Sequence, residues 1–296
     1  MEHYPVLLRE SLDWLAIRPD STLLDATCGL GNHSGAMAAA ASAGLVISND
    51  RDADSIEKAQ ANIAARHGAE TLARIKFHHG PFSRLKESLA AAGVTQVDGL
   101  LADLGVSRYQ LTEGERGFSL NSDGPLDMRM DRTQSLTASE IVNYEAEKAL
   151  ADLIYQLGEE RRSRQIARAI VRARPILSTL HLAKVIETAA PRTGKLHPAT
   201  LTFMALRLAV NEEQEELDAL LEVAPSLVKP GGRIVIIAFM SLEDRKVKQS
   251  FQSLAREGRA RLLTKHVVRP SEEEIRVNPA SRSARLRALE VTGDEG

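Results

Sequence analysis

The fold is decided by the stretch Asp25-Ala26-Thr27-Cys28-Gly29-Leu30-Gly31-Asn32-His33-Ser34. A short apolar run at 22–24 precedes it, and an Ala-rich segment at 36–43 follows. This order predicts a strand, a tight glycine turn and a helix. Glycines in such a turn let the backbone approach a nucleotide-like ligand, and the start of the next helix offers unpaired N–H groups. The stretch therefore indicates a ligand-binding turn, although a purely structural turn has the same pattern.

Strands and helices alternate along the chain around this turn. The expected strands are 22–25, 45–49, 74–78, 97–102, 233–239, 261–268 and 284–291. The alternation predicts an α/β fold: a doubly wound, mostly parallel, Rossmann-like sheet with helices on both faces. Asp50, Phe82 and Asp103 each follow the end of a strand, at the edge where open α/β sheets bind ligands.

The alternation stops after about residue 105. Residues 105–135 are rich in glycine and polar side chains, and helical patterns then continue to about residue 190. We therefore expect a helical insertion domain at 107–196, between two sheet-forming parts at 1–106 and 197–296. Within the second part, one long amphipathic helix is expected from Pro198 to about Leu227.

The composition is that of an ordinary globular chain, with 43% hydrophobic residues, 26% charged residues and a net charge of −2. Cys28 is the single cysteine, which excludes an internal disulfide, and the sequence has no Cys/His cluster that predicts a structural metal site. No signal peptide is visible, and the longest apolar stretch is shorter than the roughly 20 residues that cross a bilayer. We expect a cytoplasmic protein without membrane contact.

The chemistry of the turn distinguishes between cofactors. A dinucleotide site favours a third glycine, where this chain has Ser34, and a phosphate-binding loop needs a lysine that is absent here. Asp25 suits a ligand with a cationic group, such as the sulfonium of S-adenosylmethionine. Asp50 is placed to bind ribose hydroxyls, unless it caps the next helix, and Phe82 to stack on adenine, unless it is a core residue. These residues favour methyl transfer over hydride transfer.

Six arginines lie between positions 161 and 174 with no acidic residue among them. At about 100° per residue, four of these arginines form one stripe on a helix, whereas Ile166 and Ile170 face the other way. The stripe consists of Arg161, Arg164, Arg168 and Arg172. A solvated face is the simple explanation, but surface helices usually mix charges of both signs. We therefore expect the stripe to contact nucleic-acid phosphates.

Several longer motifs carry a family resemblance. They are Asp25-x-Thr27-x-Gly29-x-Gly31-x-His33-Ser34, His79-Gly80-Pro81-Phe82-Ser83, Leu101-x-Asp103-Leu104-Gly105, Glu115-Arg116-Gly117-Phe118-Ser119, Asp123-Gly124-Pro125-Leu126-Asp127-Met128-Arg129-Met130-Asp131 and Phe239-x-Ser241-Leu242-Glu243-Asp244-Arg245. From His3 to about Glu290, the chain resembles the bacterial 16S rRNA cytosine-N4 methyltransferases. The resemblance implies a methyltransferase sheet with a helical insertion. It also implies S-adenosylmethionine as methyl donor and, as acceptor, the exocyclic N4 of a cytosine in the decoding region of the small ribosomal subunit.

The resemblance also implies site residues by motif position. Its cofactor contacts would be Gly31, Asn32, His33, Asp50, Phe82, Asp103 and Gln110. We expect Asp103 also to orient the cytosine amino group, because it ends a strand beside the expected methyl position. The implied partners are 16S rRNA and the small ribosomal subunit. The arginine stripe and the glycine-rich neck, residues 105–135, would hold the RNA while the target base leaves its stack.

The chain departs from the family pattern at three places. Asn32 stands where a second glycine is usual, and Asn is the least costly replacement if the backbone needs a positive φ. Arg108-Tyr109 replaces a usual Ser-Pro before Gln110, which affects the placement of Gln110. Met240 replaces a usual His in the last motif, so any chemical role of that His would be missing.

Two other functions remain open on these residues. One is a dinucleotide-dependent oxidoreductase, which Ser34 and the lack of a second dinucleotide-binding half disfavour. The other is a ribosome-assembly factor that binds RNA and S-adenosylmethionine but methylates weakly or not at all. Only Met240 and Arg108-Tyr109 favour this second alternative.

Overall fold

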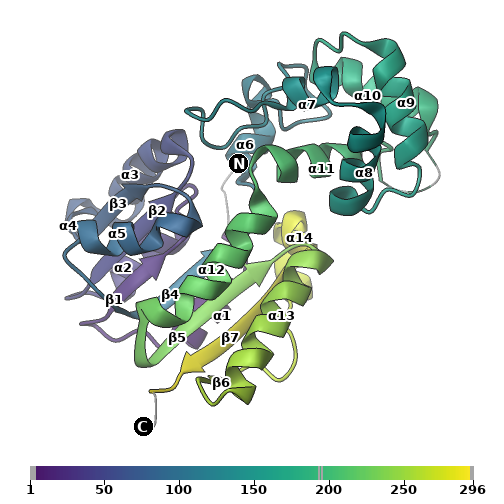
Figure 1. The fold of residues 1–296 in the computed structure, drawn as a ribbon. Helices are drawn as coiled ribbons and strands as arrows, with labels where there is room; N and C mark the ends of the chain where they lie inside the picture. Colours follow the sequence, from purple (N-terminus) through teal and green to yellow (C-terminus); the bar gives the residue numbers. More distant parts are fainter. Residues whose placement is uncertain (1–4, 193, 195, 294–296) are drawn as a thin grey trace. The chain divides into compact units, whose positions relative to one another are not determined.

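A seven-stranded sheet forms the larger part of the protein, as seen in a computed structural model that describes residues 5–192, 194 and 196–293 (Figure 1). Its strands are β1 (Thr22–Asp25), β2 (Leu45–Asp50), β3 (Ile75–His79), β4 (Val97–Asp103), β5 (Val228–Ala238), β6 (Ala260–Leu262) and β7 (Arg285–Val291). Their order is β3-β2-β1-β4-β5-β7-β6, and the first five are parallel. Only β7 runs antiparallel to its neighbours β5 and β6. The predicted doubly wound, mostly parallel sheet is confirmed.

Helices cover both faces of the sheet because successive strand residues point to opposite sides. In β4, Leu100 packs in one core with helices α5, α12 and α13, while Leu101 packs in another with α1, α2 and α3. These helices and their shorter companions are α1 (Leu8–Leu15), α2 (Asn32–Ala40), α3 (Ala53–His67), α4 (Ala69–Ala73), α5 (Leu85–Ala91), α12 (Glu213–Leu227), α13 (Ser241–Arg256) and α14 (Glu272–Val277). Figure 1 shows α12 and α13 lying along one face of the sheet.

One expected strand is shorter than the sequence suggested. The run 261–268 was expected to be a single strand, but β6 ends at Leu262 and only Val268 returns, in an isolated bridge to Leu286. The chain between them is fastened at Thr264, whose hydroxyl accepts the Ala288 N–H at 3.1 Å.

The chain folds as two compact units, one made of residues 1–105 and 215–296 and the other of residues 106–214. The second unit contains α6 (Arg108–Thr112), α7 (Ala138–Tyr144), α8 (Glu147–Gly158), α9 (Ser163–Ala173), α10 (Thr179–Ala189) and α11 (Thr200–Val210). Its C-terminal boundary lies beyond the expected residue 196, because Phe203 and Leu206 of α11 belong to the helical core. Gly158 permits this packing, since a Cβ there would lie 2.5 Å from the Leu201 carbonyl oxygen.

The prediction of a single helix from Pro198 to about Leu227 is wrong. Two helices, α11 and α12, occupy this range, and the break falls at Asn211 and Glu212. The buried Asn211 side chain donates to the carbonyls of Met128 (2.7 Å) and Arg207 (2.9 Å) and accepts the Met130 N–H (2.8 Å). Glu212 then has a left-handed φ of 48°. The long-range bonds of Asn211 to Met128 and Met130, which helical periodicity does not reveal, fix the point where α11 ends.

Close backbone contacts hold the glycine-rich neck in one conformation. Gly117 has a φ of +73°, and a Cβ there would lie 2.2 Å from the Pro125 carbonyl oxygen. Arg116 is buried under this loop and donates to the carbonyls of Arg129 (3.0 Å) and Met130 (3.1 Å). The motif residues of the neck therefore hold its own backbone together.

Within the described part of the chain, none of the helices is both long and apolar enough to cross a membrane.

We expect Asn211→Ala to destabilise the helical unit by about 2–4 kcal/mol, because the Met130 N–H and Met128 carbonyl would remain buried without partners. Native-state hydrogen exchange measures this as a lower free energy of opening for amides in 106–214. Amides of the sheet unit, and the control Asn121→Ala at an exposed position, should be unaffected. Equal losses of stability in both variants would contradict the role of Asn211.

Candidate functional site

The turn after β1 contains two residues with a left-handed backbone, and both are glycines. Gly29 has a φ of +50° and Gly31 of +81°, and a Cβ on Gly31 would lie 2.7 Å from the Ile63 side chain. Asn32 is already the first residue of α2 and has no positive φ. The premise that this backbone position needs a positive φ is therefore wrong, and Asn32 fits the turn without strain. Its side chain accepts a hydrogen bond from Arg66 at 2.8 Å.

Asp25 stabilises the turn through hydrogen bonds on its buried side. Its carboxylate is fully buried and accepts hydrogen bonds from the Ser34 hydroxyl (2.5 Å) and the Thr27 N–H (3.1 Å). Burial raises the pKa of Asp25 to about 7. The expectation that Asp25 faces a cationic ligand is not met, because the side chain has no exposed surface.

Asp50 ends β2 and is hydrogen-bonded to the same turn. One carboxylate oxygen accepts the Gly29 N–H at 2.7 Å and the other accepts the Asp52 N–H at 2.9 Å. The helix cap of α3 is Asp52, which accepts from Asp54 and Ser55, so the capping alternative for Asp50 is wrong. Burial raises the pKa of Asp50 to about 6. Each oxygen keeps a further lone pair, so this fixed carboxylate can accept ligand hydroxyls.

Phe82 is presented by a short loop after β3. It begins a 3-10 helix at Phe82–Arg84 and is half-buried against the core. The loop before it is held by Asn49, whose side-chain amide donates to the Gly80 carbonyl at 2.9 Å. The buried Asn49 was not singled out from the sequence; a polar residue inside the apolar run of β2 was the available signal.

Asp103 differs from the other two carboxylates because part of it has no partner. Its backbone N–H donates to the Thr27 hydroxyl at 2.7 Å, which fixes the residue beside the turn. Its Oδ1 atom is buried and has no hydrogen-bond partner among the described residues. Burial, together with the nearby carboxylates of Asp25, Glu243 and Glu274, raises the pKa of Asp103 well above its usual range.

His33 and two glutamates complete the surroundings of Asp103. The His33 ring lies with Nδ1 3.7 Å from Asp103 Oδ2 and Nε2 3.1 Å from the Val6 carbonyl oxygen. Glu243 accepts the backbone N–H groups of Phe239 and Met240 at the start of α13. Position 240, where a His is usual, is thus the N-cap of α13. Glu243 stands in the last family motif, but neither Glu243 nor Glu274 was predicted as a site residue, because both reach Asp103 only through the fold.

The sheet therefore brings six of the seven expected cofactor contacts to one edge: Gly31, Asn32, His33, Asp50, Phe82 and Asp103. Gln110 belongs to the helical unit, where it is buried in a capping box with Ser107 at the start of α6. Its Oε1 accepts the Ser107 N–H at 2.9 Å. The residues that replace the usual Ser-Pro, 108–109, lie within α6 and leave this capping box intact.

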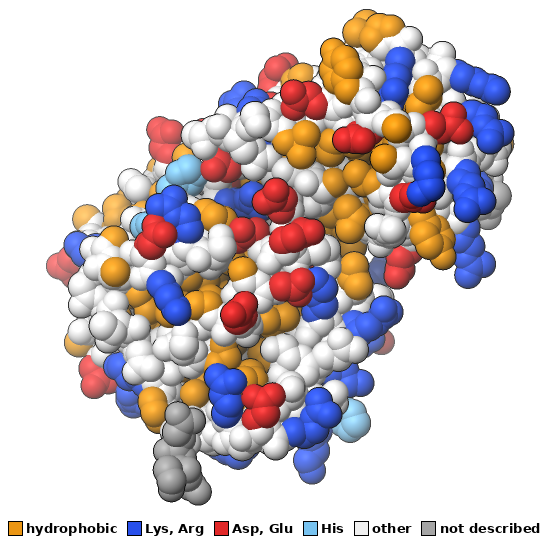
Figure 2. Space-filling model, viewed as in Figure 1, with side chains coloured by type: hydrophobic (Ala, Val, Ile, Leu, Met, Phe, Trp, Pro, Cys, Tyr) orange, Lys and Arg blue, Asp and Glu red, His pale blue; other side chains and the backbone are white. Residues whose placement is uncertain are grey.

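The arginine stripe lies on α9 and the residue pair before it. All four of its side chains are exposed: Arg161, Arg164, Arg168 and Arg172. Figure 2 shows Lys and Arg side chains gathered over the part of the helical unit where α9 lies. Arg168 has an acidic neighbour on the preceding helix α8, where Glu147 lies 3.5 Å away. Arg162 and Arg174, outside the stripe, are tied to backbone carbonyls of the unit.

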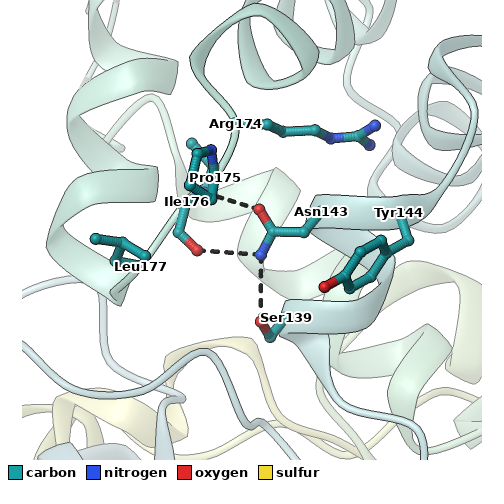
Figure 3. A pocket seen from close by; sticks show the side chains of 7 residues that line it. All are labelled: Ser139, Asn143, Tyr144, Arg174, Pro175, Ile176 and Leu177. Carbon is teal, nitrogen blue, oxygen red and sulfur yellow. Dashed lines mark hydrogen bonds between the residues drawn. The ribbon is translucent and has the colours of Figure 1, made fainter.

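A pocket of about 450 Å³ opens on the helical unit (Figure 3). Its lining consists of Ser139, Asn143, Tyr144, Arg174, Pro175, Ile176 and Leu177. Figure 3 shows Asn143 bonded to both backbone groups of Ile176 and to Ser139. The polar amide of the pocket is thus already engaged in joining α7 to the segment before α10.

The family model and the relatives that this chain matches all describe methylases. The chain matches the MraW methylase family over residues 1–292. It is 60% identical to the ribosomal RNA small subunit methyltransferase H of Solibacter usitatus, over 98% of this chain and 99% of that protein. Proteins of the same name from Acidobacterium capsulatum and Koribacter versatilis are 46% and 48% identical over 97% of this chain and 98% and 93% of their own lengths.

A carboxyl whose pKa is raised on folding makes the protein less stable as pH rises, because the folded state holds the proton more tightly. For Asp25 this loss falls between about pH 4 and pH 7, with a slope of up to about 1.4 kcal/mol per pH unit. We expect Asp25→Asn to flatten the dependence of unfolding free energy on pH in this range. The exposed Asp20→Asn should keep the wild-type slope. An unchanged slope in Asp25→Asn would show that this carboxyl is ionised throughout.

Proposed function

Because the chain belongs to the MraW methylase family, we propose that it transfers a methyl group from S-adenosylmethionine to the exocyclic N4 of a cytosine in the decoding region of 16S rRNA. The observation that carries the proposal is Asp103, a carboxyl at the end of β4 with an unpartnered buried oxygen. An amino group is a hydrogen-bond donor that such an oxygen can accept. The relatives are named for small-subunit ribosomal RNA, which supports the RNA substrate.

The residues of the sheet edge fit the cofactor. Gly31 and His33 would bind at the start of α2, Asp50 would accept the ribose hydroxyls, and Phe82 would stack on the adenine. When bound, S-adenosylmethionine supplies a methyl group on a positively charged sulfur, which a site rich in carboxylates favours. Gln110 remains a proposed contact from the helical unit.

The chemical problem is the weak nucleophilicity of the cytosine amino group, whose lone pair is delocalised into the ring. Asp103 Oδ1 would accept one N4–H, which orients the lone pair towards the methyl group. Positive charge develops on N4 as the new bond forms, and a carboxylate at this place stabilises it. The protein thereby contributes alignment and charge stabilisation.

The exposed arginine stripe of α9 is the proposed RNA contact. Guanidinium groups bind phosphates in a bidentate manner and remain charged at all physiological pH values. The target base would leave its stack to reach Asp103, because a stacked base does not expose its amino group to an enzyme pocket.

The alternatives lose support from the geometry. Position 34, where a dinucleotide site favours glycine, holds a serine bonded to Asp25. The departures that favoured a weakly methylating assembly factor lie at helix starts, 108–109 in α6 and 240 before α13, and leave Asp103 in place. No observation therefore favours either alternative over methyl transfer.

The proposed function is tested by mass mapping of small-subunit RNA from cells with and without this protein. One methylated cytosine in the decoding region should disappear when the protein is absent and return when purified protein and S-adenosylmethionine are supplied. A methyl mark on another base, or none, would overturn the assignment.

Asp103→Asn keeps the size of the side chain but removes its charge. Turnover on small subunits at saturating cofactor should fall about a hundredfold or more, because the developing positive charge on N4 loses its partner. The exposed Asp218→Asn is the matched control and should retain full turnover. Undiminished turnover of Asp103→Asn would remove this residue from the chemical step.

Replacing Arg164, Arg168 and Arg172 by Gln should weaken RNA binding and lower its dependence on salt. The slope of log affinity against log salt should fall by roughly 0.7–0.9 for each phosphate that the variant no longer binds. A triple replacement of Arg9, Arg256 and Arg259, which are exposed on the sheet unit, is the control for charge alone. If both variants bind RNA equally weakly, the stripe is not a specific contact surface.

A further inference from the structure

The imidazole ring of His33 connects the N-terminal segment at Val6 with Asp103 at the end of β4. The Val6 carbonyl oxygen lies 3.1 Å from His33 Nε2, and the next residue, Leu7, donates its N–H to Glu274 Oε1 at 2.8 Å. The other ring nitrogen, Nδ1, lies 3.7 Å from Asp103 Oδ2. All of these residues belong to the sheet unit.

The Val6 carbonyl determines which ring nitrogen carries hydrogen. A carbonyl oxygen only accepts hydrogen bonds, so His33 Nε2 must be protonated. In the neutral ring, Nδ1 then carries a lone pair and no hydrogen, and it lies 3.7 Å from Asp103 Oδ2. That contact is favourable only when a proton lies on one of the two partners, so the ring and the carboxyl have to share it.

The charges around Asp103 oppose its ionisation. The titratable groups that face it from the neighbouring elements are Asp25 of β1, Glu243 of α13, Glu274 of α14 and His33 of α2. Three of the four are acids, and they raise the pKa of Asp103 together with burial. His33 is the one group of this set that can supply a compensating positive charge.

We propose that His33 is a positioning residue for the methyl transfer: its ring, fixed by the Val6 carbonyl, holds Asp103 Oδ2 and favours the ionised form of the carboxyl against the surrounding acids, which leaves Oδ1 to accept the cytosine amino group. This inference rests on the proposed function. It gives His33 a side-chain role beyond the backbone contact that the start of α2 offers a cofactor.

The proton and electron balance follows from this arrangement. The N4 lone pair forms the bond to the methyl carbon, and the electron pair of the carbon–sulfur bond returns to sulfur. N4 then releases one proton, which Asp103 Oδ1 accepts. Asp103 holds this proton as the neutral acid until the product leaves and water reaches the partly exposed carboxyl.

Glu274 has the opposite influence on the same carboxyl. It accepts the Leu7 N–H and so anchors the segment that carries the Val6 carbonyl, but its charge disfavours the ionised form of Asp103. The pKa of Glu274 is itself raised, by burial and by Glu10 of α1. Glu274→Gln keeps an oxygen for the Leu7 N–H and removes the charge. The two variants His33→Gln and Glu274→Gln therefore separate charge from structure.

The test uses the ligand-free protein with carbon-13 labelled aspartate. NMR follows the carboxyl signal of Asp103 against pH in wild type, His33→Gln and Glu274→Gln. We expect the midpoint to rise by about one pH unit or more in His33→Gln and to fall in Glu274→Gln. The exposed His266→Gln is the control and should leave the midpoint unchanged. Midpoints that stay constant, or that move in the same direction in both variants, would overturn the proposal.

Turnover at saturating S-adenosylmethionine provides the second readout. The acidic limb of its pH profile should follow the Asp103 midpoint, because activity needs the ionised carboxyl. It should move to higher pH in His33→Gln and to lower pH in Glu274→Gln. Opposite NMR shifts without any RNA methylation would refute the proposed function and leave the His33–Asp103 coupling standing. Methylation with pH limbs that do not follow the NMR midpoints would refute the role of His33 alone.

Discussion

The withdrawal of three carboxylates from water at one edge of the sheet, Asp25 completely and Asp50 and Asp103 in part, is the constraint on which the candidate site depends. Removing a carboxylate from water costs several kcal/mol unless hydrogen bonds or opposite charges compensate. Asp25 receives its compensation from Ser34 and Thr27, and Asp50 from the N–H groups of Gly29 and Asp52. Asp103 is left with one buried oxygen that nothing in the described chain satisfies. Because Asp103 is the one carboxylate with such an oxygen among the described residues, this oxygen marks where a ligand or substrate donor belongs.

Much of the sheet unit could be predicted from the sequence, because its signals are local. The strands β1, β2 and β4 contain short apolar runs and end in an aspartate, and the turn glycines occur where left-handed backbone is needed. Features that depend on distant partners could not be predicted. Asn211 divides an apparently continuous helix through bonds to residues about 80 positions away, at Met128 and Met130. The Leu7–Glu274 bond spans 267 residues, so the surroundings of Asp103 become visible only in the folded chain.

The most specific motifs of the helical unit prove to be architectural in this structure. Arg116 is buried and holds two backbone carbonyls, Asp127 and Arg129 form an ion pair at 2.7 Å, and Gly117 makes room for a crossing backbone. Long motif matches therefore identified the family through residues that shape a loop, whereas the residues proposed for chemistry lie in short motifs at the sheet edge. The arginine stripe belongs to neither group, because its side chains are exposed and Arg168 meets only Glu147 of the neighbouring helix.

The central claim is that the carboxylate-lined edge of the sheet binds a sulfonium cofactor through Asp50 and the glycine turn. Calorimetric titration of the purified protein with S-adenosylmethionine, and separately with NAD, tests it most directly. The account predicts one S-adenosylmethionine per chain, no measurable NAD binding, and at least about a tenfold loss of affinity in Asp50→Ala, since the ribose would lose a charged acceptor. Binding of NAD, or an Asp50→Ala variant that binds S-adenosylmethionine as tightly as wild type, would contradict it.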